Sequence, residues 1–364
     1  MPLIDHFPPP LPASLEATLT TRLPVEADVG ALAELHVAAQ REHTPEGVVD
    51  EDALRSQLVG LKSWSRRQIV VVPIAADGSP TEDRDPLAWV ALEDRARGRS
   101  DLQFVVSQDV PEREALTAAL LDWAVEVGGS FARHRGVEST QLSCDTNELD
   151  TDRARALEAA GYEKVRTWLH MRRPVTADDS GAGPGPREGT RMRPVHRHES
   201  GLPVAQDVRT VHRMLEESFA DHWGSYRESF AEFVQRLIET PGEAAWDHWW
   251  IAEIDRDGLW LPAGGLVAAR MPATPTLGEG TYLEYLGVHR SARGHGIAKS
   301  LLGAAIRDAA GRGRTHVDLE VDADSPTGAD GLYGSMGWET FERTRSWHSS
   351  APAHSSRLLE PPTA

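Results

Sequence analysis

The fold of this chain is decided by the stretch Arg293-Gly294-His295-Gly296-Ile297-Ala298 and by what stands on either side of it. Residues 282–288 form a short apolar run that predicts a strand, and residues 299–312 carry apolar side chains at helical spacing. A glycine-rich turn between a strand and a helix exposes unpaired backbone N–H groups at the positive end of the helix dipole. Gly294 and Gly296 lack a Cβ atom, so their backbone can approach a phosphate closely. The pattern therefore predicts a phosphate-binding turn.

Known phosphate-binding patterns can be compared with this turn. The dinucleotide fingerprint requires a third glycine where this chain has Lys299, and the nucleotide P-loop requires a glycine spacing that is missing before Lys299-Ser300. The pattern R-x-x-G-x-A does fit, with Arg293, Gly296 and Ala298. It resembles the pyrophosphate loop of the GCN5-related N-acetyltransferases (the GNAT family), which holds the diphosphate of coenzyme A. The resemblance implies that residues 293–298 bind acetyl-coenzyme A. Lys299 and Ser300 fit a phosphate contact and a solvated helix face equally well.

The sequence that follows the loop extends the resemblance. Residues 315–322 alternate like a strand, and residues 331–338 contain Leu-Tyr and then Gly-Trp. The GNAT family closes with a strand, an N-x-x-G/A turn, a helix containing Leu-Tyr, and a Gly-Phe that opens the last strand. By this resemblance Tyr333 is the candidate general acid for the leaving thiolate. Ser325 takes the place of the usual asparagine at the coenzyme, and Trp338 replaces the phenylalanine.

Acylation of an amine requires further groups. The attacking amine must be neutral, the developing oxyanion needs a hydrogen-bond donor, and the leaving thiolate needs a proton. In the GNAT family the donor is a backbone N–H on the strand before the loop, here between Leu286 and Val288. Glu284 on the same strand is the leading candidate for the base or for an amine-binding group, because a carboxylate within a central strand is costly unless it faces a cleft. Glu320 and Asp322 are lesser candidates.

Acceptor recognition is expected in the loop after the first helix of the second half. This loop gathers polar and aromatic side chains that suit a polar small molecule, namely Asp221, His222, Trp223 and Tyr226. The alternative is a loop that caps the core with Trp223. His289 follows the central strand and could relay a proton, although a loop histidine is more often incidental. His196 and His198 lack carboxylate or cysteine partners at a suitable spacing, so no metal is expected.

The first half of the chain follows the second in the order of its patterns. Helical spacing over 25–40 precedes a series of strand-like segments and a helical segment from 113 to 127, and residues 152–162 resemble the Leu-Tyr and Gly-Trp ending. The strand-like segments are 67–74, 86–92, 102–107 and 140–144. The first half is therefore interpreted as a degraded repeat of the second.

The degraded repeat lacks the phosphate-binding turn. Asp109, Glu112 and Glu114 stand at the place of the glycine loop and would repel a phosphate. Ala156 or Leu157 takes the place of the tyrosine. We expect the first half to keep the fold without binding coenzyme, either as a structural partner or as one wall of the substrate cleft.

This duplicated layout resembles the tandem acetyltransferases of the GNAT family, a group that includes mycothiol synthase. The expected fold class is α/β, of the α+β mixed-sheet kind, with two tandem GNAT-like domains that each have a mixed central β-sheet flanked by helices. The expected parts are a degenerate domain over 1–175, a Gly/Pro-rich linker over 176–190, a catalytic domain over 191–348 and a flexible tail over 349–364.

Composition limits the class of protein and its partners. The 364 residues suffice for two domains, and no apolar run approaches the length of a transmembrane helix, so a cytoplasmic protein without membrane contact is expected. The single cysteine, Cys144, excludes an internal disulfide. A formal net charge of −18 disfavours nucleic acid and favours a cationic substrate. Coenzyme phosphates must then be held by local basic and backbone groups.

Three functions remain open on the sequence. The first is an acetyl-coenzyme A-dependent N-acetyltransferase, without a metal, in which the primary amine of a small polar molecule attacks directly in a ternary complex. The second is an acyltransferase of the same fold with another donor, either a longer acyl-coenzyme A or an aminoacyl-tRNA. The third is a noncatalytic coenzyme-binding module. The acceptor and the oligomeric state are left open, with a homodimer as one possibility.

Overall fold

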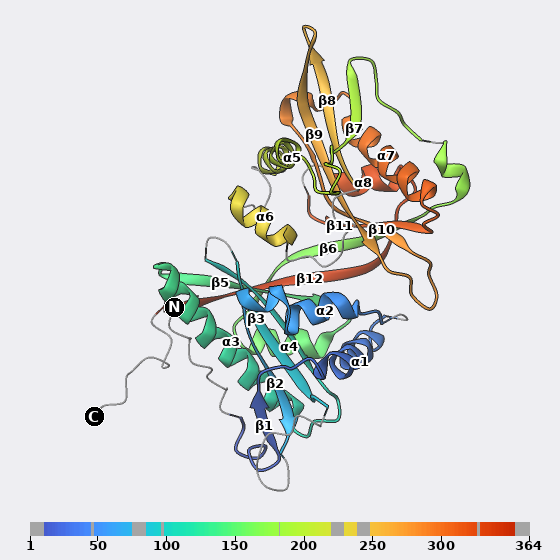
Figure 1. Cartoon of the computed structure of the whole chain (residues 1–364). Coiled ribbons are helices and arrows are strands. Elements are labelled where there is room, and N and C mark those ends of the chain that lie inside the picture. The colour runs from blue at the N-terminus through green and yellow to red at the C-terminus, as the bar shows by residue number, and fades with distance from the viewer. Residues whose placement is uncertain are drawn as a thin grey trace. The chain divides into compact units, whose positions relative to one another are not determined.

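The computed structural model describes residues 11–44, 47–74, 85–95, 98–181, 183–219, 229–238, 248–325 and 328–353. The chain divides into two compact units: the first comprises residues 1–167 and 343–364, and the second comprises residues 168–342. Figure 1 labels the helices and strands of both. Within the described residues, no helix is both long and apolar enough to cross a membrane.

The first unit is a mixed β-sheet with helices on both faces. Its strands lie in the order β1, β2, β3, β4, β5 and β12, and β4 and β5 run parallel to each other. Its elements are β1 (Leu19–Arg22), α1 (Asp28–Arg41), α2 (Glu51–Leu58), β2 (Arg66–Pro73), β3 (Ala88–Arg95), β4 (Arg99–Val106), α3 (Arg113–Arg135), β5 (Ser139–Asn147), α4 (Thr151–Ala159) and part of β12 (Glu339–Pro352).

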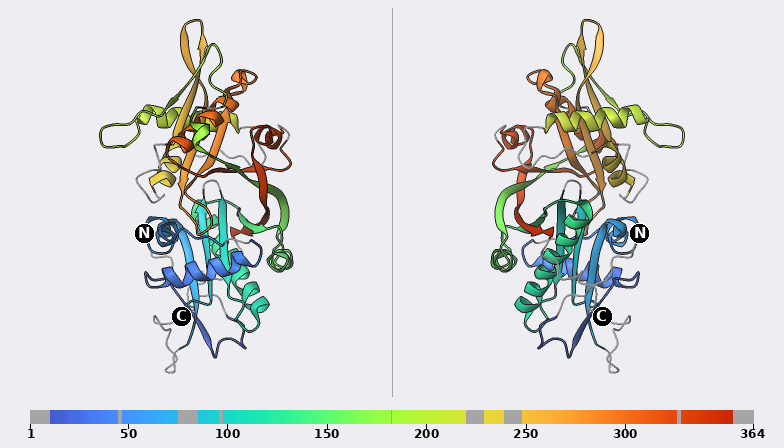
Figure 2. Two further views of the ribbon diagram at one scale, coloured as in Figure 1. Left: turned by 90° about the vertical axis from the view of Figure 1, so that its right-hand side faces the viewer. Right: turned by 90° about the vertical axis from the view of Figure 1, so that its left-hand side faces the viewer.

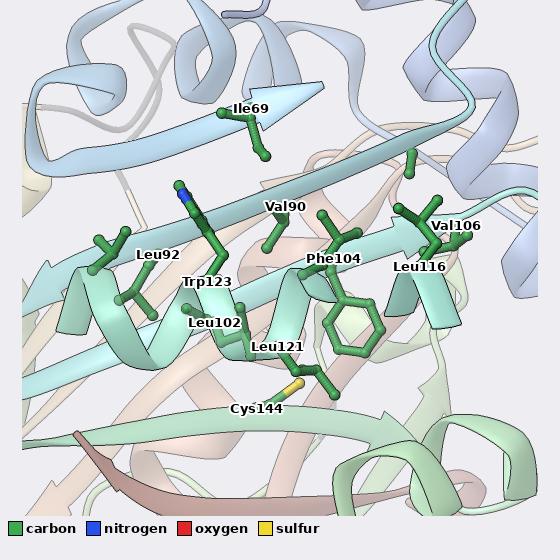
Figure 3. Packing of buried hydrophobic residues seen from close by; sticks show 14 of the residues in the cluster. Ile69, Val90, Leu92, Leu102, Phe104, Val106, Leu116, Leu121, Trp123 and Cys144 are labelled. Atoms are coloured by element: carbon green, nitrogen blue, oxygen red, sulfur yellow. The ribbon is translucent and has the colours of Figure 1, made fainter. Parts of the chain in front are cut away.

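Helices cover both faces of this sheet because its strands are apolar on both sides. Ile69 packs in the core under α3, whereas its neighbour Val70 packs with α1 and α2. Figure 3 shows the side chains of Leu116, Leu121 and Trp123 from α3 among those of the strands. Alternate residues of one strand therefore serve two separate cores.

The second unit has the same construction. Its strands lie in the order β6, β11, β10, β9, β8 and β7, with β10 and β11 parallel. Its elements are β6 (Glu163–Pro174), β7 (Thr190–Pro194), α5 (Ala205–Ser218), α6 (Phe230–Ile238), β8 (Trp249–Arg256), β9 (Leu259–Met271), β10 (Gly280–Val288), α7 (Ile297–Gly311), β11 (His316–Asp322) and α8 (Ala329–Gly334). Trp249 and Ile251 pack with α5 and α6, whereas Trp250 and Ala252 pack with α7, so these helices lie on opposite faces (Figures 1 and 2).

Both halves of the chain have the same order of elements. Each begins with a strand and two helices, continues with three strands, a long helix and a strand, and ends with a short helix and a last strand. The predicted repeat and the expected mixed sheets flanked by helices are confirmed.

The last strand of each half crosses into the other unit. β11 pairs along its length with residues 168–174 of β6, and β5 pairs with residues 344–352 of β12. The two units therefore differ from the boundaries expected at 175 and 348, because the last strand of each half pairs within the sheet of the other unit. The start of the flexible tail expected at residue 349 also differs from the structure. β12 continues to Pro352, and Ala351 is fully buried in the core of the first unit.

Candidate active site

The glycine loop lies in the second unit between a short 3-10 helix, η4 (Arg290–Ala292), and α7. Gly294 and Gly296 have φ of 84° and 78°, a left-handed conformation that glycine adopts without steric cost. Gly296 is the N-cap of α7, so the N–H groups of the first helical turn have no intrahelical acceptor. Arg293 and His295 are exposed beside this turn. The loop therefore offers backbone N–H groups, a guanidinium and the positive end of a helix to an anion.

The first turn of α7 can contribute its backbone but few of its side chains. Ile297 is buried in the core under α7, and Ala298 is partly buried. Ser300 is also buried, and its Oγ donates a hydrogen bond to the carbonyl oxygen of Gly185 at 2.9 Å. Lys299 is exposed. The two residues therefore differ: Ser300 belongs to an internal contact, and Lys299 lies at the surface.

The strand before the loop contains a β-bulge. The pairing of β10 with β9 shifts register between Leu283 and Tyr285, so Glu284 is the additional residue of the bulge. On its other edge β10 pairs with β11 only from Gly280 to Leu283, although β11 continues along β6 to Asp322. The two parallel strands therefore separate after Leu283, shortly before the glycine loop. In the described structure, the β10–β11 ladder does not use the backbone of residues 286–288.

The bulge also sets the direction of the side chains that follow it. Leu283, Leu286 and Val288 all pack with the core under α7. Strict alternation would place Leu283 and Leu286 on opposite faces, and the additional residue corrects this. Gly287 faces α5 instead, where a Cβ atom would lie 2.9 Å from Ser218 Oγ. Leu286 and Val288 thus have backbone, rather than polar side chains, to offer a ligand.

Both strands carry carboxylates beyond the end of their pairing: Glu284 on β10, and Glu320 and Asp322 on β11. Burial raises the pKa of Tyr282, and the charges of Glu320 and Glu284 raise it further. The Tyr282 hydroxyl therefore stays neutral at neutral pH. Glu284 is exposed, whereas Asp322 is 3% exposed. Of the predicted base candidates, Glu284 thus combines accessibility with a place at the bulge.

One polar residue of this face was missed by the sequence reasoning. His170 of β6 is paired in register with Glu320 of β11, and His170 Nε2 lies 3.1 Å from Glu320 Oε2. Next to them, Arg172 forms a bidentate pair with buried Asp318, with N–O distances of 2.8 to 3.2 Å. The polar residues His170 and Arg172, two positions apart on β6, could have indicated a polar face of this strand. That pattern identifies the partners Glu320 and Asp318 only once β6 is known to pair with β11.

Tyr333 lies on α8 and is partly buried against the core under α7. Its ring meets that of Trp338 edge to face, with 6.0 Å between the ring centroids. Burial raises the pKa of Tyr333 to about 12. The phenol therefore stays protonated at neutral pH and can donate a hydrogen bond to a thiolate.

The other predicted residues have varied surroundings. Ser325 follows β11 in a turn, and its N–H donates to the Asp322 carbonyl at 3.2 Å. His289 caps η4: its Nδ1 accepts from the Ser291 N–H at 3.2 Å, and its Nε2 lies 2.9 Å from Glu217 Oε2. Its ring thus shapes the turn before the glycine loop. The predicted acceptor residues Asp221, His222, Trp223 and Tyr226 lie outside the described residues. In the part of the chain that is described, no group of His, Cys, Asp and Glu side chains could hold a metal ion.

The first unit has a different residue at each corresponding place. Glu112 is the N-cap of α3 with φ 56° and ψ 39°, so it repeats the left-handed conformation of Gly296 with a carboxylate side chain. β4 pairs with β3 without a register shift, so it lacks the bulge. Leu157 matches Tyr333, because in both helices the carbonyl of this residue accepts from the N–H five residues later, at 2.9 and 3.2 Å.

The point where β4 and β5 separate is also filled. Their pairing covers only residues 99–101 and 141–143. Beyond it, the guanidinium carbon of Arg153 lies 4.1 Å from the centre of the Phe104 ring, and its Nη2 lies 3.9 Å from Cys144 Sγ. Phe104 belongs to β4 and Cys144 to β5, so Arg153 bridges the separated strands.

Part of the second half matches the model of a known protein family. Residues 210–338 match the model of the Acetyltransferase (GNAT) family. The matched segment contains the glycine loop, the bulge and Tyr333. Residues 210–338 therefore form an acetyltransferase domain of the GNAT family.

Solved structures extend the similarity to the tandem fold. A GCN5-related N-acetyltransferase from Sphaerobacter thermophilus has 22% sequence identity and a TM-score of 0.66, over 96% of this chain and 100% of that one. A tandem GNAT protein from the clavulanic acid biosynthesis pathway has 14% identity and a TM-score of 0.64, over 92% and 98% of the two chains. At these identities the structural similarity shows a shared fold and nothing further. No curated protein matches the chain.

Proposed function

We propose that this chain is an acyl-coenzyme A-dependent N-acyltransferase that transfers acetyl from acetyl-coenzyme A to the primary amine of a small polar molecule. One observation carries the proposal: the second unit combines the glycine loop at the start of α7 with the bulge at Glu284 and the separation of β10 from β11. The first unit has the same elements but a glutamate in the loop, no bulge and a filled separation. The features that differ are those that a bound thioester coenzyme would require.

In the proposed reaction the amine nitrogen attacks the thioester carbon, a C–N bond forms and the C–S bond breaks. The glycine loop holds the diphosphate, so the thioester end can extend along β10. A backbone N–H between Leu286 and Val288 donates to the thioester oxygen as it gains charge. Glu284 accepts one proton from the bound ammonium group, which leaves the nitrogen neutral for attack. The second proton, which the nitrogen loses as the amide forms, goes to the departing thiolate, to which Tyr333 donates a hydrogen bond.

The acceptor is proposed to be a cationic amine. Glu284 and Glu320 each directly follow the last pair of the β10–β11 ladder, Leu283 with Leu319, and the net charge of the chain is −18. Both attract a protonated amine and disfavour a tRNA donor. Asp221, His222, Trp223 and Tyr226 remain candidates for contacts with the acceptor. The resemblance to the mycothiol synthase type, cytoplasmic localisation and a homodimer also remain predictions.

The test is calorimetric titration with acetyl-coenzyme A, free coenzyme A and a longer acyl-coenzyme A. We expect one site per chain, lost in Gly296→Glu and retained in Asp109→Ala, whose side chain lies in the corresponding loop of the first unit. A thiol-release assay with a panel of amines then identifies the acceptor class.

Each alternative has its own outcome. Preference for the longer acyl chain would favour another acyl-coenzyme A donor. Binding without thiol release for any amine would favour a noncatalytic module. Absence of binding to all three compounds would contradict the proposal and the coenzyme-binding module alike, and would leave a tRNA donor.

A further inference from the structure

The segment expected to be a linker lies against the coenzyme-binding helix. Residues 183–190, called the strap below, precede β7 in the second unit. Ser300 Oγ donates to the Gly185 carbonyl at 2.9 Å, and Arg307 Nη1 donates to the Pro184 carbonyl at 3.4 Å. Gly303 permits this approach, since a Cβ atom there would lie 2.5 Å from the Pro184 oxygen. The strap is therefore packed on α7 by specific contacts.

The other end of the strap is fixed by β7. The carbonyl oxygen of Arg187 accepts hydrogen bonds from the Thr190 N–H at 2.9 Å and from Thr190 Oγ1 at 2.7 Å. Thr190 is the first residue of β7 and pairs with Ile254 of β8. The backbone of Arg187 is thus held between an ordered helix and an ordered strand.

The side chain of Arg187 lies on the glycine loop. A Cβ atom at Gly296 would lie 2.7 Å from Arg187 Nε, and Arg187 Nη1 is 3.4 Å from the Gly294 carbonyl oxygen. Arg187 is exposed, and among the described residues no carboxylate forms an ion pair with it. A guanidinium without a carboxylate partner therefore lies over the two glycines that have positive φ.

We propose that Arg187 binds the diphosphate of the coenzyme together with the glycine loop, so that the strap is part of the coenzyme site. This inference rests on the proposed function. A guanidinium presents two parallel N–H groups to phosphate oxygens, which a loop of backbone N–H groups alone does not. In a chain with a net charge of −18, such a cation also offsets the unfavourable field on an approaching polyanion.

The test compares coenzyme A with 3′-dephospho-coenzyme A, which keeps the diphosphate. Titration of the full chain should show that Arg187→Ala binds both compounds about 10- to 100-fold more weakly than wild type, as for hydrogen bonds to a charged group. Arg187→Lys keeps the charge but loses the paired donors, so its affinity for both compounds should lie between that of wild type and that of Arg187→Ala. Arg197→Ala removes the same charge from an exposed residue beyond the far end of β7 and should bind like wild type. The thermal unfolding midpoint of Arg187→Ala should equal that of wild type.

Several results would overturn the inference. Unchanged affinity of Arg187→Ala for the coenzyme would overturn it. Tighter binding by Arg187→Ala would also overturn it, and would show that Arg187 blocks access to the glycine loop. Weaker binding of coenzyme A alone would assign Arg187 to the 3′-phosphate, and a lowered unfolding midpoint would make it a structural contact. If wild type binds neither compound, the proposed function fails and this inference with it. If wild type binds both and Arg187→Ala binds them equally well, only this inference fails.

Discussion

Gly296 and Glu112 occupy the N-cap positions of α7 and α3, and both have a positive φ. For a residue other than glycine this conformation costs about 1–2 kcal/mol. Glu112 accepts a hydrogen bond from Ser14 Oγ at 2.6 Å, but this exposed bond offsets only part of that cost. The first unit has therefore kept the shape of the loop while a carboxylate has made it unsuitable for phosphate.

Glu112→Gly should raise the free energy of unfolding by about 0.5–1 kcal/mol, because release of left-handed strain exceeds the added entropy of glycine in the unfolded chain. Glu114→Gly in the first turn of α3 should lower it by about 1 kcal/mol. Denaturant unfolding measures both. Calorimetry of Glu112→Gly should still show one coenzyme site. Leu157 still stands at the place of Tyr333, and Arg153 still fills the space where β4 and β5 separate. A destabilised Glu112→Gly would contradict the strain argument.

Tyr333→Phe should separate chemistry from binding. The phenylalanine ring can keep the contact with Trp338, so coenzyme affinity should change less than about twofold, while loss of the hydroxyl should lower kcat by about 10²–10³-fold. Because burial raises the pKa of Tyr333 to about 12, this residue should add no falling limb to the pH profile of wild-type kcat below about pH 11. Unchanged kcat in Tyr333→Phe would remove the hydroxyl from the mechanism.

At the scale of elements, α7 serves two partners at once. One side packs into the core under the sheet through Leu301, Leu302 and Ala305. The other carries the strap, which approaches closely enough that Gly303 needs to be glycine. The helix therefore fixes the glycine loop at its N-terminus and the strap along its side, so the position of Arg187 depends on packing more than a turn away from the loop.

Replacement by alanine at two glycines of α7 should change the free energy of unfolding in opposite directions. Gly303→Ala should lower the free energy of unfolding by about 1 kcal/mol, because displacement of the Pro184 carbonyl outweighs the gain in helix propensity. The same variant should make the strap accessible to cleavage by trypsin after Arg187. Gly311→Ala should stabilise by up to about 1 kcal/mol, because its Cβ would have no neighbour within 4 Å. Limited proteolysis and thermal unfolding measure both effects. Equal cleavage of the two variants would show that the strap does not depend on this contact.

Most elements were predictable from local pattern, and the misses have a common cause. The strand over 282–288 and the helix over 299–312 follow from periodicity, and the loop between them from its glycines. The predicted end of α3 at residue 127 was wrong, because the helix continues to Arg135. In the structure Gly128 lies inside the helix, where a Cβ atom would be 2.8 Å from Ala351. The bulge at Glu284, like that contact, depends on strand register and long-range packing, which local pattern does not contain.

At the scale of the whole molecule, the two crossing strands make each half depend on the other. Trp347 and Ala351 come from the end of the chain and are buried in the core of the first unit. Met171 and Val175 come from the end of the first half and are buried in the core of the second. A degenerate copy that had become dispensable would not supply a strand to the acetyltransferase domain. The first half therefore has a structural role whether or not it contacts the acceptor.

This dependence predicts how fragments behave. A fragment of residues 191–348, the catalytic domain as its sequence suggests, lacks the part of β6 that pairs with all of β11. It exposes the buried surface against Met171 and Val175, at about 1.5–3 kcal/mol for each side chain, and an unpaired strand edge. The two side chains together amount to about 3–6 kcal/mol, which reaches the lower end of the stability of a domain, about 5–15 kcal/mol. A fragment of residues 168–342 restores the strand and should show a cooperative thermal transition and bind coenzyme A, whereas 191–348 should do neither. If 191–348 unfolds at the same midpoint as 168–342, then β6 completes the sheet without stabilising it, and the halves are more independent than their pairing indicates.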